Sequence, residues 1–299
     1  MNGLRTVIFA YSEVGHLCLS ELLRQGVRVE AVFTHEDSPG ETQWFPSVAK
    51  LAASTGISVY APGSLDDKEY ELVRGLRPDA LFSFYYRSLI PERFLGLPPL
   101  GAFNMHGSLL PKYRGRACVN WAILNGETVT GATLHHMVRR ADAGDIVDQE
   151  AVPILFEDTA RTVSRKVAEA SCLLVERNIA AIAGGTAPRT PQDERKATTF
   201  GRRTPADGLV SWSWDAIRIY NLVRAVTHPF PGAFTSFKGR TLLLWSVLPE
   251  GGDEQAAPGT VLSSAPLVVA AGRGRIQVLH SEWAEGPGQA LAAGDVLES

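Results

Sequence analysis

The sequence predicts an α/β protein in which a mostly parallel sheet with helices on both faces precedes a smaller antiparallel β-barrel. Three observations support this prediction. Apolar runs typical of buried strands alternate with helically spaced apolar residues through the first half of the chain. After residue 205 the pattern changes to short alternating stretches separated by turn residues. The length of 299 residues is enough for two domains.

The first half predicts a Rossmann-like arrangement, because strand-like and helix-like segments alternate along it. Residues 6–10 form a continuous apolar run, which suits a strand that is buried on both faces. Leucines at helical spacing follow within residues 17–23. Repetition of this pattern favours parallel strands with helical crossovers. We expect further strands at 27–33, 59, 79–84 and 101–105, and helices at 48–52 and 66–76.

The second half predicts a connecting segment and an OB-like β domain. A polar stretch with prolines and a charge cluster is typical of an interdomain connection. An amphipathic helix is expected at 215–226. Short strands are expected at 233–237, 241–247, 259–262, 267–270 and 275–279. The predicted boundaries are residues 1–185 for a larger catalytic domain, 186–204 for a linker and 205–299 for the β-rich domain.

Composition excludes several classes of protein. Lys and Arg number 29 against 32 Asp and Glu, and this balance argues against non-specific nucleic-acid binding. The three cysteines are widely spaced and form no disulfide or metal-binding pattern, which favours a reducing compartment. The apolar run at 7–10 is too short for a signal peptide, and no later run reaches ~18 residues. We therefore expect a cytoplasmic protein without membrane insertion.

The turn after the first expected strand argues against a dinucleotide cofactor. Residues 10–15, Ala-Tyr-Ser-Glu-Val-Gly, lack the GxGxxG pattern that lets a backbone approach a pyrophosphate closely. We therefore do not expect NAD or FAD, although the strand and helix pattern is Rossmann-like.

Asn104 and His106 are the first candidate site residues. They lie at i and i+2 near the end of an apolar strand, so their side chains share one face. The carboxyl ends of strands in open α/β sheets are where ligands bind. Buried polar groups are costly unless they are satisfied or used. From residue types alone, a turn-capping Asn and a hydrogen-bonded structural His are equally compatible with this pattern.

A second candidate, Asp142, lies in the charged stretch 139–145 between two strand-like segments, 131–138 and 146–153. The stretch could be a solvated hairpin, or Asp142 could orient a histidine and stabilise its charged form. His135 and His136 are adjacent on an expected strand and point to opposite faces, so they do not form a simple metal pair.

These motifs resemble the 10-formyltetrahydrofolate-dependent formyltransferases. The resemblance rests on Asn104-x-His106, the SLLP run at 108–111 and Asp142 within ADAGDIV. Within the family the chain looks most like the formyltransferase half of the bifunctional polymyxin-resistance enzyme. We expect no counterpart of that enzyme's decarboxylase domain within the 299 residues, and Cys118 replaces a usual proline. The matching stretches are 82–87, 106–117, 125–128, 140–144, 200–205 and 231–234.

The resemblance implies a mechanism without metal, in which 10-formyltetrahydrofolate is the co-substrate. Asn104 would donate to the oxyanion, His106 would move the proton, and Asp142 would raise the pKa of His106. Tyr85, Tyr86 and Arg87 would line the acceptor pocket or simply pack. Arg202 and Arg203 would meet a diphosphate or remain solvated. The implied folate contacts are Ser88, Leu89, Ile90, Arg116, Val138, Arg139, Arg140, Ala141 and Asp142, of which Arg116 could instead be a surface arginine.

The resemblance also implies the acceptor. It would be UDP-4-amino-4-deoxy-L-arabinose, a small-molecule nucleotide sugar that is formylated on its 4-amino group in lipid A modification and polymyxin resistance. Alternatives are methionyl-tRNA, another nucleotide-linked amino sugar, or a non-catalytic folate-binding role, against which the intact trio argues. Residues 205–299 hold six Lys and Arg against nine Asp and Glu, which argues against tRNA. The oligomeric state cannot be predicted from these patterns.

Overall fold

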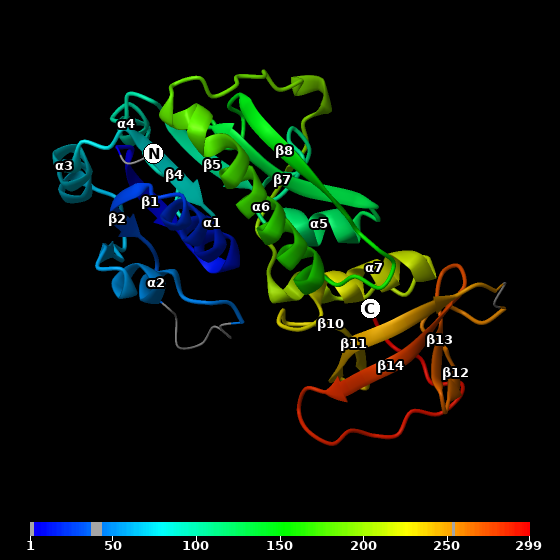
Figure 1. Cartoon of the computed structure of the whole chain (residues 1–299). Helices are drawn as coiled ribbons and strands as arrows, with labels where there is room; N and C mark the ends of the chain where they lie inside the picture. Colours follow the sequence, from blue (N-terminus) through cyan, green and yellow to red (C-terminus); the bar gives the residue numbers. More distant parts are fainter. Residues whose placement is uncertain (1–2, 37–43, 253–254) are drawn as a thin grey trace. The chain divides into compact units, whose positions relative to one another are not determined.

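The computed structural model describes residues 3–36, 44–252 and 255–299, which form two compact units (Figure 1). The predicted fold class is confirmed: a mostly parallel, Rossmann-like sheet precedes an antiparallel sheet. The first unit comprises Met1–Cys118, Val129–Pro153 and Ser164–Phe200, and the second comprises Val119–Thr128, Ile154–Val163 and Gly201–Ser299.

The first unit is built on a seven-stranded sheet with the order β3-β2-β1-β4-β5-β7-β8. Strands β1 to β5 are parallel, whereas β7 and β8 are antiparallel to their neighbours. The chain order reverses between β1 and β4, and ligands bind beside the carboxyl ends of strands at such points. The strands are β1 (Arg5–Ala10), β2 (Arg28–Phe33), β3 (Ser58–Tyr60), β4 (Ala80–Phe84), β5 (Ala102–His106), β7 (Val129–His136) and β8 (Ile146–Pro153).

The core of this unit explains the apolar run of the first strand. Val7 and Phe9 of β1 point into a buried cluster that also contains Phe33, Val73 and Phe94. The rings of Phe9 and Phe33 stack with centroids 4.8 Å apart. The intervening β1 residues are also fully buried, so the strand is covered on both faces as expected.

Helices cover the sheet on both faces. The helix α3 begins in a capping box, in which the Asp66 carboxylate accepts from the backbone of Lys68. The 24-residue helix α6, which the sequence analysis did not predict, is tied to β8 by a hydrogen bond from Asn178 to Asp148. Figure 1 shows α1 and α6 on one face. The helices of the first unit are α1 (Ser12–Arg24), α2 (Val48–Ser54), α3 (Asp67–Leu76), α4 (Glu92–Leu95) and most of α6 (Ala160–Ala183), whereas α5 (Cys118–Leu124) belongs almost entirely to the second unit.

The segment that we expected to be a linker forms specific contacts. Its strand β9 (Thr199–Phe200) pairs in parallel with β6 (Arg114–Gly115). Thr190 forms a backbone bridge with Ile146 at the start of β8. Between these points lies a short helical turn, η1 (Glu194–Lys196). The segment up to residue 200 is therefore part of the first unit.

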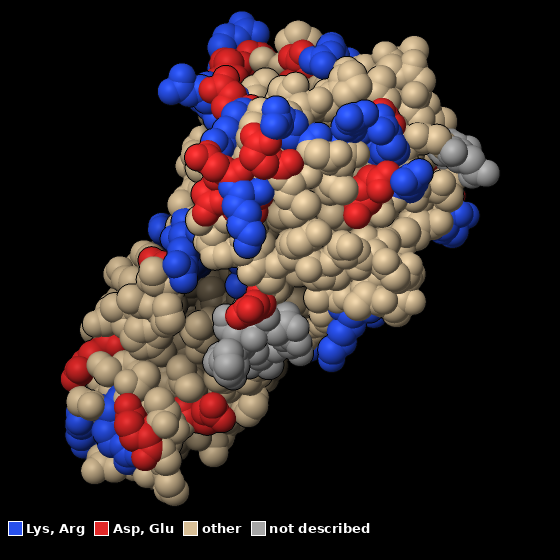
Figure 2. Space-filling model, turned by 90° about the vertical axis from the view of Figure 1, so that its left-hand side faces the viewer, with Lys and Arg blue, Asp and Glu red and all other residues tan. Residues whose placement is uncertain are grey.

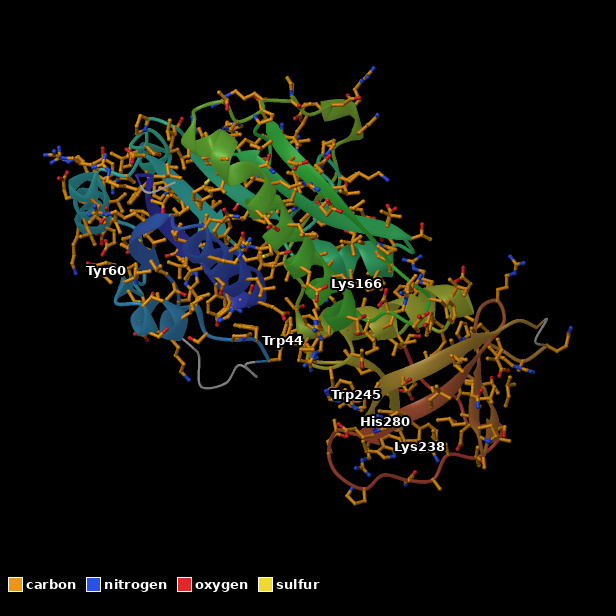
Figure 3. The ribbon with its side chains drawn as sticks, viewed as in Figure 1. Trp44, Tyr60, Lys166, Lys238, Trp245 and His280 are labelled. Atoms are coloured by element: carbon orange, nitrogen blue, oxygen red, sulfur yellow. The ribbon has the colours of Figure 1, made fainter. Side chains whose placement is uncertain are left out.

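The second unit contains a five-stranded antiparallel sheet with the order β10-β11-β14-β13-β12. Backbone bridges join residues 296–298 to the edge strand β10 and to Thr260 beside β12, so both edges are partly covered. Trp245 of β11 and His280 of β14 are labelled in Figure 3. The elements are η2 (Pro205–Gly208), α7 (Ala216–Val226), β10 (Ala233–Phe237), β11 (Arg240–Glu250), β12 (Val261–Ser264), β13 (Leu267–Ala270) and β14 (Arg275–Trp283).

Candidate active site

Strand β5 brings two polar side chains to the carboxyl edge of the first sheet. Asn104 and His106 share one face, and His106 is only 6% exposed. In the register with the neighbouring strands, Asn104 lies opposite Ser83 of β4 and His135 of β7. The pairing therefore places a second histidine directly beside Asn104.

Asp142 reaches the same place from the loop between β7 and β8. Its backbone has a φ of 56°, in the left-handed region that Asp tolerates better than most residues. The Oδ2 atom accepts a hydrogen bond from the backbone of Gly115 at 2.9 Å. The Oδ1 atom lies 3.5 Å from His106 Nδ1, 3.5 Å from Asn104 Nδ2 and 3.6 Å from His135 Nε2. The structure thus brings the predicted trio together.

The proton position on His106 follows from its hydrogen bond. Its Nε2 atom lies 2.7 Å from the carbonyl oxygen of Tyr113, and a carbonyl can only accept, so Nε2 carries the hydrogen. Nδ1, which faces Asp142, is therefore the basic nitrogen. Burial lowers the pKa of His106 by more than the Asp142 carboxylate raises it. The carboxylate therefore raises the pKa of His106 as predicted, but burial outweighs this effect, and His106 is neutral near pH 7.

Asp142 stays ionised in this buried setting. Burial by itself raises the pKa of its carboxyl group. His106, His135 and the Gly115 N–H together lower that pKa further than burial raises it, so the net direction is downward. The site therefore combines a buried carboxylate with a neutral imidazole.

His135 is a further residue beside the trio, and the sequence patterns did not indicate it as a partner of Asn104. It is 2% exposed, and its Nδ1 donates to the carbonyl oxygen of His136 at 2.9 Å. Its Nε2 therefore accepts from Asn104 Nδ2 at 3.1 Å and orients the amide. His136 points to the opposite face, where it bonds to Pro188. Within 3–36, 44–252 and 255–299, no group of His, Cys, Asp or Glu is arranged to hold a metal.

The expected folate contacts lie on loops around the trio. Leu89 is 79% exposed and Val138 is 47% exposed, which is unusual for large apolar side chains. Ser88, Arg139, Arg140 and Ala141 are also exposed, whereas Ile90 is buried. Arg139 approaches Glu92 at 3.9 Å, so the loop after β7 lies close to the start of α4. Arg116 donates to the Arg87 carbonyl at 3.0 Å and lies against the loop after β4.

The three residues after β4 have different surroundings. Tyr85 packs tightly against Gly107, where an added Cβ would lie 1.7 Å from the tyrosine hydroxyl. Tyr86 stacks on His35 with ring centroids 4.3 Å apart. The Arg87 guanidinium lies 4.4 Å from the centre of the Tyr11 ring. A hollow of about 440 Å³ opens at the carboxyl ends of β2, β3 and β4, lined by His35, Glu36, Ala61, Pro62, Gly63 and Arg87.

The two arginines predicted to meet a diphosphate belong to the second unit. Arg203 lies over the Trp121 ring at 4.7 Å and donates to the Asp207 carbonyl at 2.8 Å. Burial lowers the pKa of Arg203. Arg202 is exposed. Arg203 is therefore already engaged by its own unit.

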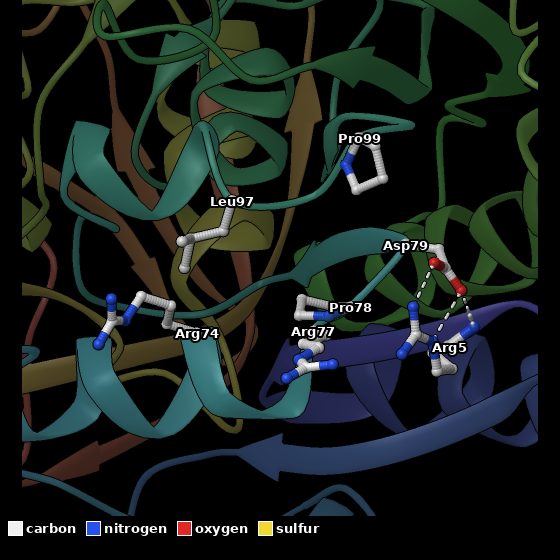
Figure 4. Close-up of a pocket in the computed structure, with 7 residues that line it drawn as sticks. All are labelled: Arg5, Arg74, Arg77, Pro78, Asp79, Leu97 and Pro99. Atoms are coloured by element: carbon white, nitrogen blue, oxygen red, sulfur yellow. Dashed lines mark hydrogen bonds and ion pairs between the residues drawn. The ribbon is translucent and has the colours of Figure 1, made fainter.

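A second hollow, of about 270 Å³, lies at the amino ends of β1 and β4 (Figure 4). Arg5 and Asp79 form a hydrogen-bonded ion pair there at 2.9 Å. Arg74 is paired with Glu71 outside the hollow. This hollow contains no histidine and no arrangement for proton transfer. Its lining residues are Arg5, Arg74, Arg77, Pro78, Asp79, Leu97 and Pro99.

The fold and this buried cluster define an α/β protein with a candidate acid–base site at the carboxyl end of a strand, and sequence comparison identifies the family. Residues 6–177 match the formyl transferase family, and residues 202–295 match its C-terminal domain. The first match covers more than half of the chain, so the protein belongs to the formyl transferase family and transfers formyl groups. In the described part of the chain, no helix is both long and apolar enough to cross a bilayer.

Solved structures with the same fold include three sugar or N-formyltransferases. The N-formyltransferase from Helicobacter canadensis, in complex with folinic acid and dTDP-3-aminofucose, is 21% identical; the match covers 92% of this chain and 99% of that one, with a TM-score of 0.71. The sugar 3N-formyltransferase WlaRD, with dTDP and 5-N-formyl-THF, is 19% identical over 93% and 98%, with a TM-score of 0.69. A 4-N formyltransferase from Francisella tularensis is 21% identical over 77% and 90%, with a TM-score of 0.62.

Proposed function

We propose that this enzyme transfers the formyl group of 10-formyltetrahydrofolate to the amino group of a nucleotide-linked amino sugar. The observation that carries the proposal is the meeting of Asn104, neutral His106 and ionised Asp142 at the carboxyl end of β5. The complexes of similar proteins with folinic acid and a dTDP-linked amino sugar support both substrate classes.

Asn104 stabilises the oxyanion in this mechanism. Attack of the neutral acceptor amine on the formyl carbon forms the new C–N bond and places negative charge on the formyl oxygen. One hydrogen of the Asn104 amide is held by His135, whereas the contact to Asp142 at 3.5 Å is at the limit of hydrogen bonding. Because that contact is weak, the second hydrogen can be donated to an oxyanion that lies beside it, and such a donor is worth about 2.7–4 kcal/mol.

His106 moves the proton that this reaction must transfer. Its Nδ1 accepts a proton from the attacking nitrogen and delivers it to the departing N10 as the old C–N bond breaks. Asp142 stabilises the imidazolium that forms between these two steps. The lowered pKa of His106 keeps Nδ1 unprotonated, and thus able to act as a base, near pH 7.

The folate lies, in this proposal, between the loop that carries Ser88, Leu89 and Ile90 and the loop of residues 138–142. The exposed side chains of Leu89 and Val138 provide apolar surface for the pterin, and nearby backbone groups provide hydrogen bonds. Arg116 anchors the first of these loops through the Arg87 carbonyl.

The first acceptor to test is UDP-4-amino-4-deoxy-L-arabinose. This choice of acceptor is supported by the resemblance of residues 82–87 and 106–117 to the formyltransferase half of the polymyxin-resistance enzyme. With this acceptor, the reaction would take place in the cytoplasm and would belong to lipid A modification and polymyxin resistance. The hollow beside His35 and Arg87 suits the nucleotide, because a guanidinium binds phosphate oxygens well. Basic and acidic side chains are interspersed on the face in Figure 2, an arrangement that does not favour tRNA.

A formyl-transfer assay tests the proposal. The purified protein is given 10-formyltetrahydrofolate and a panel of UDP- and dTDP-linked amino sugars, beside aminoacylated initiator tRNA. We expect turnover of at least one nucleotide sugar, with UDP-4-amino-4-deoxy-L-arabinose the best. Turnover of another sugar would correct the acceptor, and turnover of the tRNA alone would overturn the substrate class.

A further inference from the structure

The Gln192 side chain joins the expected linker to the loop that carries Asp142. Its Nε2 donates to the backbone carbonyls of Asp142 at 2.9 Å and Gly144 at 2.7 Å. Its Oε1 accepts from Arg114 Nε at 3.1 Å and Nη2 at 2.6 Å. Both donors and both acceptor positions of the amide are therefore used, which fixes its orientation.

These hydrogen bonds form a closed loop of contacts that includes both the backbone and the carboxylate of Asp142. Arg114 is 2% exposed and holds Gln192, and Gln192 holds the backbone of Asp142. The Asp142 carboxylate is then bound by the backbone of Gly115, which follows Arg114 in the chain. Glu194 completes the pairing of the buried guanidinium at 2.7 Å.

We propose that Gln192 is a positioning residue that fixes the Asp142 carboxylate relative to His106 and Asn104, an inference that rests on the proposed function. The geometry is sensitive to small movements, since Asp142 Oδ1 lies 3.5–3.6 Å from three nitrogens rather than in close contact with one. The left-handed backbone of Asp142 also needs an external restraint. A misplacement of about 1 Å can cost roughly 100-fold in rate.

The His106 imidazole reports the position of that carboxylate. The charged and titratable groups that act on it are Asp142, which raises its pKa, and His135 and Arg114, which lower it. The Tyr113 carbonyl also raises the pKa. Movement of Asp142 away from the ring therefore lowers the pKa of His106.

The test is a double-mutant cycle with Gln192→Met and Asp142→Asn. We expect Q192M to lower kcat roughly 10-fold, less than a full 1 Å misplacement would. It should also lower the pKa of His106, followed by NMR of ring-labelled histidine in the unliganded protein. If Gln192 acts through the carboxylate, Q192M has no further effect on either quantity in the D142N protein. If Q192M fails to fold, Gln192→Glu replaces it in the kcat cycle, because it retains the acceptor for Arg114.

Gln149→Met is the matched control. The Gln149 side chain also joins two segments by hydrogen bonds, since its amide donates to the Leu110 carbonyl at 2.9 Å and to the Thr133 hydroxyl. These bonds do not involve the loop that carries Asp142. The effect of Gln149→Met on kcat should be the same with and without D142N. An equal kcat loss from Q192M in both backgrounds, or an unchanged His106 titration, would overturn the positioning role. If the D142N protein keeps the kcat of the wild type, the proposed function is overturned instead. The pKa of His106, measured by NMR in the same set of variants, would then still decide the role of Gln192.

Discussion

Each edge of the first sheet holds one carboxylate, and the two carboxylates differ in how closely they are hydrogen-bonded. At the amino edge, Asp79 accepts from the Arg5 side chain at 2.9 and 3.2 Å and also from the Arg5 backbone. At the carboxyl edge, Asp142 Oδ1 has three nitrogen neighbours, all at 3.5 Å or more. One carboxylate is saturated by a partner with permanent charge, and the other lies among groups that can change their protonation or rotate.

This difference separates a structural ion pair from a reactive site. The hydrogen bond from Arg5 is the main cause of the lowered pKa of Asp79. The pKa of Asp142 is lowered against the opposing effect of burial, mainly by a histidine. The Asp142 carboxylate is held at Oδ2 by the Gly115 N–H, whereas its Oδ1 has only distant neighbours and has capacity to stabilise a charge that forms during a reaction. Under the proposed function, the closely bonded Asp79 marks a structural ion pair, and the more loosely held Oδ1 of Asp142 marks the reacting edge.

The largest expected effect comes from removing the base at the carboxyl edge. His106→Asn should lower kcat by about 10²–10⁴-fold, because no other group in the site is placed to accept at the Nδ1 position. Binding of 5-formyltetrahydrofolate, measured by calorimetry, should persist, since the expected folate contacts lie on other loops. His136→Asn is the control, because that ring points to the other face. Unchanged turnover in H106N would remove His106 from the mechanism.

The next effect tests the oxyanion donor. Asn104→Ala should lower kcat by about 10²–10³-fold, because it deletes the amide that the proposal aims at the formyl oxygen. The loss should fall mainly on kcat rather than on KM, since the contact forms in the transition state. Steady-state kinetics with the acceptor found in the panel provides the measurement. An increase in KM with unchanged kcat would assign Asn104 to substrate binding.

The two β5 residues and Asp142 were predicted from the sequence, whereas His135 and Gln192 were not. Asn104 and His106 stand out because two polar residues at i and i+2 interrupt an apolar strand. His135 joins them only through the antiparallel register of β5 with β7, which no local pattern specifies. Gln192 lies 50 residues from Asp142 in a segment whose polar composition suggested only a linker.

The fold, like the site, was predicted where local sequence patterns specify an element and was missed where they do not. The apolar run of β1 is a local signal, and the strand expected at 6–10 and the helix expected at 66–76 lie close to the observed bounds of β1 and α3. The helix α6 was missed, and its tie to β8 through Asn178 is a tertiary contact that local sequence does not reveal.

At the amino edge, Asp79→Asn should change stability and leave kcat unaltered. It removes the charge that Arg5 binds, so the urea midpoint should fall slightly, as is usual for an ion pair that is still partly exposed to solvent. The folded pKa of Asp79 is lowered, so its stabilisation is present above the unfolded pKa of about 3.9 and is lost as pH falls through the folded value. The midpoints of D79N and the wild type should therefore converge in acid. A large drop in kcat would show that the two edges are not independent.

The smallest effect is a pH dependence of stability that arises at the carboxyl edge. Burial lowers the folded pKa of His106, whereas the unfolded pKa is about 6.5, so below that pH the unfolded chain binds more protons. The free energy of unfolding should therefore rise with pH from below 6.5 up to neutrality. Urea unfolding at pH 5.5 and 7.0 should show a smaller rise in H106N than in the wild type. His136 also has a lowered pKa and retains its share in that variant, so the slope should shrink without vanishing. An identical slope in both proteins would mean that His106 takes up its proton as readily in the folded site as in water, and would remove the buried neutral base on which the contrast between the two edges depends.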